Sequence, residues 1–443
     1  MAKHDISELY ELQGLSLNEK IRRTQARIKQ WVDYYGLEHV YVSFSGGKDS
    51  TVLLDIARKM YPIKAVYLDT SLEFPELREF VKTYDDVEWL KPKKNFRQVV
   101  EQFGYPLISK DFAECVHGAK NYLTRLAKEI SLDRPTDRPT DRPTDQKEYL
   151  RQGGQELLES IITERSVELA NLLNERMLKR QGGQNLRLAI MLGWLTKDKN
   201  RPIAVNIPSK DYSQFTQERY KFLLYAPFNI SNYCCKVFKK NIAHDYNHEH
   251  DCHPIIATMA TESRLRTQKW LENGCNGFNL REPVSNPMSF WTENDVLMYA
   301  KLNNIKLASV YGDIVEDYKK EGQIKGQMSF ADLGLFDKVP VYTTTGCFRT
   351  GCVACGFGIQ CDKRPNRFEL IDRVSNPKLR DWIMRGGSFD EDGLWKPDNN
   401  GLGYWFVLQY LNVHGNMNIY IPEYERYERE FGNEQTREYL KAK

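Results

Sequence analysis

The segment that most constrains this chain is Ser43-Phe-Ser-Gly-Gly-Lys-Asp-Ser50, close to its N-terminus. The apolar run at 39–44 predicts a buried strand, and residues 49–60 predict a helix. Glycines between a strand and a helix let the backbone approach an anion closely, and the amides of the first helical turn point at that anion. The segment therefore predicts a phosphate-binding loop on an α/β fold.

Polar side chains of the same loop can add to phosphate binding. Ser45 and Ser50 can donate hydroxyl hydrogen bonds to phosphate oxygens, and Lys48 supplies a point charge. The loop is too short for the Gly-x4-Gly-Lys-Ser/Thr motif and lacks the Gly-x-Gly-x-x-Gly dinucleotide motif. The alternative is a glycine-rich turn with a chance lysine. Agreement between the loop, the strand before it and the helix after it favours the phosphate site.

Strands and helices continue to alternate after the loop. This pattern predicts a doubly wound parallel sheet covered by helices on both faces, an arrangement of the Rossmann-like type. Thr292 is the expected N-cap of the helix within 289–305, with Asp295 at the third helical position. We expect strands at 63–68, 87–90 and 254–259, and helices at 16–35, 75–83 and 95–103.

Three tandem copies of Asp-Arg-Pro-Thr interrupt the pattern at 133–144. Repeated proline removes backbone donors, and the copies contain nothing apolar to bury, so we expect a disordered or extended linker. Leu150-Arg-Gln-Gly-Gly-Gln155 recurs as Lys179-Arg-Gln-Gly-Gly-Gln184, as expected of a helical insert. The expected segments are a nucleotide-binding domain in two parts (1–132 and 201–315), the linker (133–146), the helical insert (147–200) and a cysteine-rich C-terminal region (316–443).

Composition narrows the function classes. A net charge of +3 over 443 residues gives no global signature of polyanion binding, although a local basic channel stays open. The N-terminal residues are polar and no apolar run reaches the ~20 residues of a membrane span, so we expect a cytoplasmic protein without a membrane partner. In that compartment the nine cysteines are expected to bind metal rather than form disulfides.

Two cysteine groups have spacings that suit a metal centre. Cys234 and Cys235 are adjacent, and Cys352 and Cys355 form a Cys-x-x-Cys pair, with Cys347 as the main rival ligand. Zinc, an iron–sulfur cluster and inert buried thiols are the three alternatives. Adjacent cysteines match the two knuckles of a structural zinc site poorly.

These motifs resemble the PP-loop superfamily of adenine nucleotide α-hydrolases, and within it the phosphoadenosine phosphosulfate (PAPS) reductase-like family. Leu68-Asp69-Thr70 and the following Ser71-Leu-Glu-Phe-Pro-Glu76 are similar to the Asp-Thr-Gly-x-x-Phe-Pro-Glu segment of that family. The resemblance implies that ATP or a sulfonucleotide binds, and that the backbone at 68–70 reads adenine. It implies that the pyrophosphate is held by the loop residues Ser43, Phe44, Ser45, Gly46, Gly47, Lys48, Asp49 and Ser50.

Two further segments extend the resemblance. Glu262-Ser-Arg264-Leu-Arg266 is similar to the Glu-Ser-x-x-Arg segment that meets the nucleotide, so Arg264 and Arg266 are expected to bind phosphate or sulfate. The Cys-Cys pair with a remote Cys-x-x-Cys resembles the [4Fe–4S] ligation of adenylyl-sulfate reductases. It implies a cluster held by Cys234, Cys235, Cys352 and Cys355.

Two departures from the family modify the expected reaction. Thiol-dependent sulfonucleotide reductases carry a C-terminal Glu-Cys-Gly-x-His nucleophile, whereas this chain has no cysteine after Cys361. The loop also has the full Ser-Gly-Gly-Lys-Asp-Ser form that resembles members acting on ATP. We therefore expect cleavage of ATP, with Mg²⁺, between its α- and β-phosphates, with Lys48, Asp49 and Arg264 as the catalytic residues.

Sulfur transfer through the cluster is the expected sequel, with a sulfur-donor protein and a nucleic-acid acceptor as candidate partners. One alternative is a sulfonucleotide reductase that uses Cys347 or Cys361 as its nucleophile. The other is an ATP-binding sensor or nucleic-acid-binding module with a structural metal site. The sequence indicates neither the acceptor nor the oligomeric state.

Overall fold

The computed structural model describes residues 3–132, 162–164, 166–178, 183–197, 202–206, 211, 213, 216–317 and 340–441. The described chain forms two units. The first comprises Met1–Asn95, Lys236–Val353 and Leu370–Asn376, and the second comprises Phe96–Cys235, Ala354–Glu369 and Pro377–Lys443. The predicted linker at 133–146 lies outside the described residues, as does the first copy of the Arg-Gln-Gly-Gly repeat.

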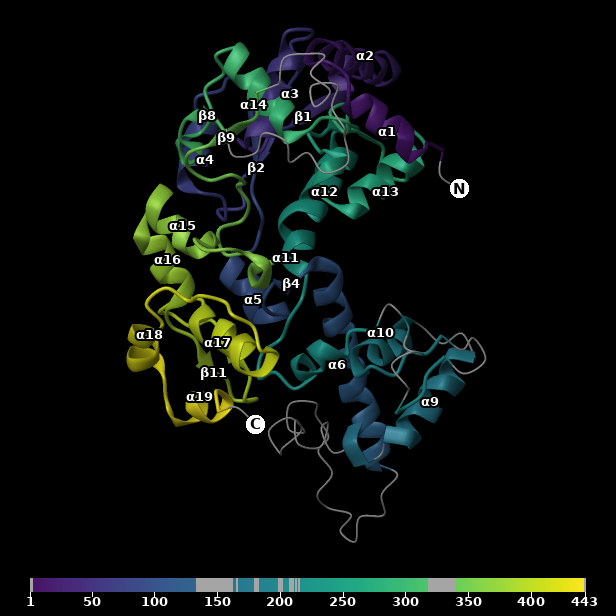
Figure 1. Cartoon of the computed structure of the whole chain (residues 1–443), viewed down its shortest axis with the longest axis vertical. Helices are drawn as coiled ribbons and strands as arrows, with labels where there is room; N and C mark the ends of the chain where they lie inside the picture. Colours follow the sequence, from purple (N-terminus) through teal and green to yellow (C-terminus); the bar gives the residue numbers. More distant parts are fainter. Residues whose placement is uncertain are drawn as a thin grey trace. The chain divides into compact units, whose positions relative to one another are not determined.

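A mainly parallel sheet is the centre of the first unit (Figure 1). Its order is β3-β2-β1-β5-β7-β6, and β6 alone in this sheet runs antiparallel to its neighbour. Strand β1 pairs with β2 on one edge and with β5 on the other, so the strand order reverses at β1. Ligands bind at such a reversal in open α/β sheets. The strands are β1 (Val40–Ser43), β2 (Ala65–Leu68), β3 (Val87–Leu90), β5 (His253–Ile255), β6 (Asn276–Gly277) and β7 (Val284–Ser285).

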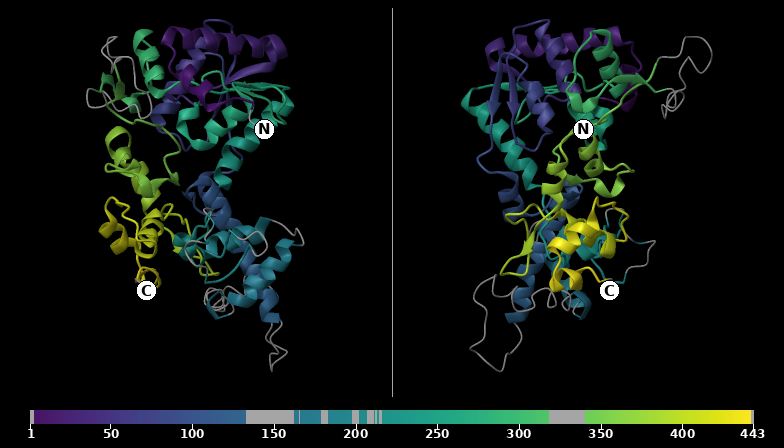
Figure 2. Two further views of the ribbon diagram at one scale, coloured as in Figure 1. Left: turned by 45° about the vertical axis from the view of Figure 1, so that its right-hand side comes forward. Right: turned by 90° about the vertical axis from the view of Figure 1, so that its left-hand side faces the viewer.

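Side chains of β1 alternate between the two faces of this sheet, as a strand covered on both faces requires. Val40 and Val42 join a large apolar core with residues of α2 (Leu17–Tyr35), α3 (Lys48–Arg58) and α14 (Glu293–Leu302). Tyr41 points to the opposite face and packs with Tyr246 of α12 (Asn241–Glu249). Figure 2 shows helices on both sides of these strands. The predicted doubly wound fold is confirmed.

The helices and strands that the sequence predicted for the first unit agree with the observed elements to within a few residues, and the structure adds several short elements that were not predicted. Helix α4 follows β2, and the expected strand at 254–259 is the shorter β5. Both the Thr292 cap and its reciprocal partner Asp295 are present at the start of α14. The other elements are α1 (Ile6–Gln13), η1 (Leu37–His39), α4 (Pro75–Val81), the π-helical turn η4 (Lys236–Lys240), η5 (Ala260–Glu262), α13 (Arg264–Asn273), η6 (Ser309–Tyr311), β8 (Ile314–Glu316) and β9 (Tyr342–Thr344).

A buried ion pair joins α2 to α14. Lys20 Nζ lies 2.7 Å from Asp295 Oδ2, and the two side chains are 3% and 11% exposed. The same carboxylate oxygen accepts hydrogen bonds from the backbone N–H and the hydroxyl of Thr292. One carboxylate thus caps α14 and neutralises a lysine of α2.

The second unit is mainly helical, with short strand pairs. In the part of the insert that the structure describes, α10 packs along α6, and the hydroxyl of Tyr122 donates a hydrogen bond to Asn185 Oδ1. This part of the insert is helical, as expected. The elements are α5 (Phe96–Phe103), β4 (Leu107–Ile108), α6 (Lys110–Leu132), α9 (Ser166–Leu178), α10 (Gly183–Leu192), η3 (Glu218–Leu224), α11 (Tyr233–Cys235), β10 (Gly356–Phe357), η7 (Ile359–Cys361), α16 (Pro377–Met384), β11 (Ser388–Phe389), β12 (Trp395–Lys396), α17 (Tyr404–Gly415), α18 (Tyr424–Phe431) and α19 (Glu434–Tyr439); α15 (Arg367–Val374) crosses the division between the units.

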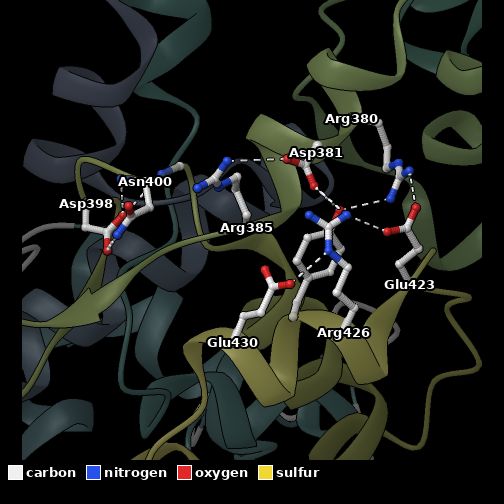
Figure 3. Close-up of polar contacts among 10 residues, drawn as sticks. Arg380, Asp381, Arg385, Asp398, Asn400, Glu423, Arg426 and Glu430 are labelled. Carbon is white, nitrogen blue, oxygen red and sulfur yellow. Dashed lines mark hydrogen bonds and ion pairs between the residues drawn. The ribbon is translucent and has the colours of Figure 1, made fainter.

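Charged side chains tie α16 to α18 in the C-terminal part of this unit (Figure 3). Arg380, which is 5% exposed, donates to Glu423 Oε1 and, over 2.9 Å, to the hydroxyl of Tyr427. Arg426 lies 3.3 Å from Asp381 Oδ1. A buried guanidinium needs such partners, so these contacts give Arg380 a structural role in holding α16 against α18.

The two units divide the chain differently from the expected domains. The first part of the nucleotide-binding domain was expected to end at 132, whereas the first segment of the first unit ends at Asn95. Helices α5 and α6 belong to the second unit because they pack with β4, α10 and α11. The expected C-terminal region 316–443 is divided between both units. In the described part of the chain, no helix is both long and apolar enough to cross a membrane.

The Lys20–Asp295 pair gives the first prediction. Lys20→Met leaves the Asp295 carboxylate buried without its counterion, so we expect a loss of about 3–5 kcal/mol in unfolding free energy, measured by denaturant titration. Arg23→Ala removes an exposed pair with Glu19 from the same helix and is the matched control, with an expected loss of less than about 1 kcal/mol. Equal losses for both variants would contradict the assigned role.

Candidate nucleotide-binding site

The loop between β1 and α3 is shaped by backbone conformation and by internal hydrogen bonds. Gly46 has φ of 71°, a left-handed conformation that favours glycine. A Cβ atom there would lie 2.8 Å from Val81 Cγ2 and 3.2 Å from Leu77 O, so α4 leaves no room for a side chain. The hydroxyls of Ser45 and Ser50 lie 3.0 Å apart, and Ser50 Oγ donates to Gly47 O over 2.9 Å. The loop is therefore held in one shape by the fold around it.

Lys48 is buried at the start of α3 and is held from two sides. Its Nζ lies 2.8 Å from Glu293 Oε1 and donates to Phe348 O over 2.9 Å. Burial by itself would lower the pKa of Lys48, but the charges of Asp49 and Glu293 outweigh burial and raise it. The ammonium group therefore stays charged beside the loop, as an anion site requires.

Asp49 has a buried carboxylate oxygen that lacks a protein partner. Its Oδ1 atom makes no hydrogen bond with any described residue, although part of the side chain reaches the surface. Burial raises the pKa of Asp49, and Lys48, Arg349 and Arg266 offset part of this rise. A buried polar atom without a partner is rare in folded proteins and calls for a functional explanation. Carboxylate oxygens such as this atom are typical protein ligands of Mg²⁺.

Tyr311 and Thr350 complete the surroundings of the loop. The backbone N–H of Lys48 donates to the Tyr311 hydroxyl over 3.1 Å, and that hydroxyl lies 2.7 Å from Thr350 Oγ1. This N–H is one of the backbone amides of the first helical turn that the sequence predicts to bind phosphate. Sequence reasoning missed Glu293, Tyr311, Phe348, Arg349 and Thr350, because they follow the loop by more than 240 residues and belong to no motif that marks a phosphate site.

The second predicted nucleotide segment, Leu68-Asp69-Thr70, follows β2. Asp69 is 1% exposed and forms an ion pair of 2.8 Å with Arg78, and the Thr70 hydroxyl donates to Glu73. Ser71 has φ of 59°, a left-handed conformation at the position where the related motif has glycine. These side chains are engaged in shaping the turn, so contact with an adenine ring would come from the backbone.

The structure distinguishes between the two candidate arginines of α13. Arg266 pairs with Glu262, and burial lowers the pKa of Arg266 while the charge of Asp49 raises it. Arg264 is exposed at the first position of the helix. Arg266, and not the predicted catalytic Arg264, is therefore the residue with a described electrostatic link to the loop.

A cavity of about 440 Å³ lies beside Arg266. Its lining includes Ile256, Thr258 and Asn286, which directly follow β5 and β7, and Trp270 of α13. Cavities of this size are typical of small-ligand sites, and the carboxyl ends of the strands are where α/β sheets bind ligands. No sequence motif indicates this cavity.

Three of the four predicted cluster ligands come together in the second unit. Cys234 and Cys235 lie on α11, and Cys355 directly precedes β10. Cys235 and Cys355 influence each other electrostatically, and Cys234 and Cys355 both act on the pKa of Tyr404. Cys352 belongs to the first unit and precedes Cys355 by three positions in the chain.

Several groups around Cys355 would stabilise a thiolate ligand. The pKa of Cys355 is raised overall because burial outweighs the Phe357 backbone N–H and the positive charges of Arg367 and Lys110, which act to lower it. Arg367 also donates to the backbone oxygens of Cys355 and Phe357 over 3.0 and 2.7 Å. N–H groups and positive charge around a cysteine sulfur are usual at iron–sulfur centres. The donor set therefore fits a cluster.

Of the other cysteines, Cys347 is 2% exposed, and burial raises its pKa to about 11. A thiol with that pKa is a poor ligand and nucleophile, which argues against Cys347 in either predicted role. Cys361 is exposed at the end of η7. Burial also raises the pKa of Cys115 to about 11, and its thiol donates to Arg187 O.

Comparison with known proteins gives a family match for the N-terminal segment of this site. Residues 39–133 match the family model described as the phosphoadenosine phosphosulfate reductase domain. The matched segment contains the loop, β2 and the turn at 68–76. Among solved structures, phosphoadenylyl-sulfate reductase from Candida auris in complex with phosphate is similar at 11% identity and a TM-score of 0.28, over 76% of this chain and 95% of that chain. A similarity at that level supports no inference about activity.

Gly46 gives the second prediction. Gly46→Ala forces a side chain into a left-handed residue against α4, so we expect a loss of at least about 1–2 kcal/mol in unfolding free energy, together with lost phosphate binding. Gly351→Ala is the control, because a Cβ there meets no atom within 4 Å, and its expected change is within about 0.5 kcal/mol. Unfolding free energy by denaturant and phosphate binding by calorimetry are the measurements. Unchanged stability of Gly46→Ala would contradict the geometry.

The raised pKa of Asp49 gives a pH-dependent prediction. Because the folded pKa exceeds the unfolded one, the folded chain binds more protons between the two values, and Asp49 lowers stability as pH rises through that window. Asp49→Asn should therefore be more stable than wild type near neutral pH, and the difference should shrink as pH falls through the folded pKa. Denaturant unfolding across pH measures it. A gain that does not change with pH would refute the assignment.

Proposed function

We propose that this chain is a PP-loop enzyme of the PAPS reductase-like family, whose loop binds ATP and which cleaves ATP between the α- and β-phosphates; the match of residues 39–133 to the PAPS reductase domain supports the family. The observation that carries the proposal is the buried Oδ1 of Asp49, which has no hydrogen-bond partner among the described residues and lies beside a charged lysine. A nucleophilic oxygen of the acceptor would attack the α-phosphorus, the bond to the bridging oxygen would break, and pyrophosphate would leave. The product is an adenylated acceptor.

The amides, Lys48 and Asp49 of the loop would each have a separate role in this reaction. The amides at the start of α3 would hold pyrophosphate oxygens, helped by the helix dipole. Lys48 would offset the negative charge that develops on the leaving group. Asp49 would hold Mg²⁺, which supplies charge neutralisation when bound. Positioning and electrostatics are the main sources of rate in phosphoryl chemistry of this kind.

Two arginines close to the loop support the proposal that the loop binds the anion ATP. Arg266 and Arg349 both act electrostatically on Asp49, so the loop has two cations besides Lys48. Arg266 also lines the cavity that follows β5 and β7, which could receive the nucleoside or the acceptor. We replace Arg264 with Arg266 as the phosphate-binding arginine and keep Arg264 as an exposed candidate for contacts with a larger acceptor.

A second step would use sulfur. The proposed [4Fe–4S] cluster, held by Cys234, Cys235, Cys352 and Cys355, would bind or relay sulfur when present. A sulfur atom would displace AMP from the adenylated acceptor by forming a carbon–sulfur or phosphorus–sulfur bond. A sulfur-donor protein and a nucleic-acid acceptor are the proposed partners, in a cytoplasmic setting that keeps the thiols reduced.

Pyrophosphate release tests the first step. Wild-type protein incubated anaerobically with ATP, Mg²⁺ and candidate acceptors should release pyrophosphate, and Lys48→Ala should reduce the rate at least about 100-fold, as the loss of one transition-state charge contact does. Lys59→Ala is the matched control, because this exposed lysine lies at the other end of α3 and pairs with Asp55. Absence of ATP-dependent release with every acceptor would reject the proposal.

Substitution of Glu293 in the same site should favour ATP binding, in contrast to substitution of Lys48. Glu293→Gln removes a negative charge 2.8 Å from Lys48 Nζ, so ATP should bind more tightly, by roughly three- to tenfold. Titration calorimetry with ATP measures this change. Weaker binding by Glu293→Gln would show that the carboxylate supports the nucleotide rather than competing with it.

Sulfonucleotide reduction is the second candidate, favoured by the match to the PAPS reductase domain. A thiolate would attack the sulfur, the sulfur–oxygen bond to the nucleotide would break, and a second thiol would release sulfite as a disulfide forms. Cys361 is the nucleophile that this reaction would use, because Cys347 is buried. Sulfite production from PAPS or adenylyl sulfate that is lost in Cys361→Ser and kept in Cys347→Ser would favour this candidate over ATP cleavage.

An ATP-binding sensor or nucleic-acid-binding module is the candidate of another class. It would bind ATP tightly without turnover in the cluster-loaded protein, and its metal site would be structural. The pyrophosphate assay separates this function from the two enzymatic ones.

A further inference from the structure

Two histidines and a glutamate form a cluster in the first unit, separate from the loop and from the cysteines. His244 and His248 lie one turn apart on α12, and Glu282 lies in the turn between β6 and β7. Their ligand atoms all lie within 4.8 Å of one another. We propose that His244, His248 and Glu282 form a binding site for a divalent transition-metal ion of the Zn²⁺ class.

The separations within this His–Glu cluster match a metal coordination sphere. His244 Nε2 lies 3.2 Å from Glu282 Oε1, and His248 Nε2 lies 3.6 Å from the same oxygen. Metal–ligand bonds of ~2.0–2.1 Å in a tetrahedron place neighbouring ligand atoms roughly 3.3 Å apart. An ion could therefore enter between the three side chains with only small side-chain adjustments.

The helix presents the two imidazoles in a fixed direction. Residues four apart lie on one face of a helix, and Tyr246 between them points to the opposite face. Tyr246 is 4% exposed and donates to Glu88 over 2.8 Å, while Tyr41 donates to Asn247 Oδ1 over 2.7 Å. These contacts fix α12 on the sheet, so both histidines face outward and are accessible to ions.

A carboxylate also lies near the other ring nitrogen of His244. Its Nδ1 atom is 3.5 Å from Asp245 Oδ1. Outer carboxylates of this kind orient metal-bound imidazoles and raise their basicity. Two imidazoles and one carboxylate form a donor set that suits zinc, and three protein ligands leave a coordination position for water or another ligand.

The bound ion would join α12 to the turn that follows β6. These two elements are far apart in the sequence, and a shared ion would restrain both. Because the ion would bind the folded chain alone, it would also raise the unfolding free energy, by an amount that grows with the logarithm of the metal concentration above its Kd. We therefore expect zinc bound at this surface site to stabilise the first unit by linking α12 to the turn that follows β6.

Zinc titration of the tag-free protein tests this site. The wild type should bind one more equivalent of Zn²⁺ than His244→Ala/His248→Ala, and a thermal shift on zinc addition should be smaller in the double variant. The cysteines are the same in both proteins, so thiol binding cancels in the comparison. Glu282→Gln should weaken the extra site by about tenfold or more, since it replaces a charged ligand with a neutral one.

His250→Ala is the matched control, because His250 lies just past α12 and contacts Tyr246, with ring centroids 4.5 Å apart, without joining the cluster. It should keep the additional equivalent. Addition of Cu²⁺ should give an electron paramagnetic resonance signal with nitrogen hyperfine structure that the double variant lacks. Equal zinc stoichiometry and equal copper spectra for the wild type and the double variant would overturn the proposal and leave the three residues as surface ion pairs.

Discussion

The pairing of β1 on both of its edges is the constraint on which the nucleotide site depends. Because β2 and β5 hold the strand from either side, its carboxyl end can turn into α3 in only one place, at the reversal of the strand order. Helix α4 then packs so closely on Gly46 that no side chain fits there. Hydrogen bonds among Ser45, Gly47 and Ser50 fix the rest of the turn. The shape of the loop is thus set by the sheet and its helices before any ligand binds.

The charges around this loop come from distant parts of the chain. Lys48 and Asp49 are neighbours in the loop, Glu293 begins α14, and Arg349 follows β9. Burial disfavours the charged form of each side chain. The negative charges of Asp49 and Glu293 nevertheless keep Lys48 ionised. Asp49 differs from the others because one of its buried oxygens has no protein partner among the described residues. In the structural ion pair Lys20–Asp295, by contrast, the Oδ2 atom of Asp295 pairs with Lys20 and also accepts hydrogen bonds from Thr292.

Local sequence signals predicted most of the sheet domain. Short apolar runs marked β1, β2 and β3, and the Thr292–Asp295 cap marked the start of α14 at the correct residue. The loop itself was evident because glycine, lysine and serine have defined tasks at a phosphate site. The sequence could not indicate that Arg266 rather than Arg264 neighbours Asp49, since this depends on the rotation of α13. Glu293, Tyr311 and Thr350 were missed because tertiary packing alone brings them to the loop. The division after Asn95 was missed because α5 follows β3 with the same spacing as a helix of the sheet domain.

The most direct test of the central claim is a crystal structure of the protein with a non-cleavable ATP analogue, in which a methylene group replaces the α,β-bridging oxygen, and Mg²⁺. The account predicts that the β- and γ-phosphates lie on the amides of Gly47, Lys48 and Asp49, that Lys48 Nζ contacts a phosphate oxygen, and that Asp49 Oδ1 binds the metal. Phosphates located away from the β1–α3 turn, with Asp49 Oδ1 still without a partner, would contradict it.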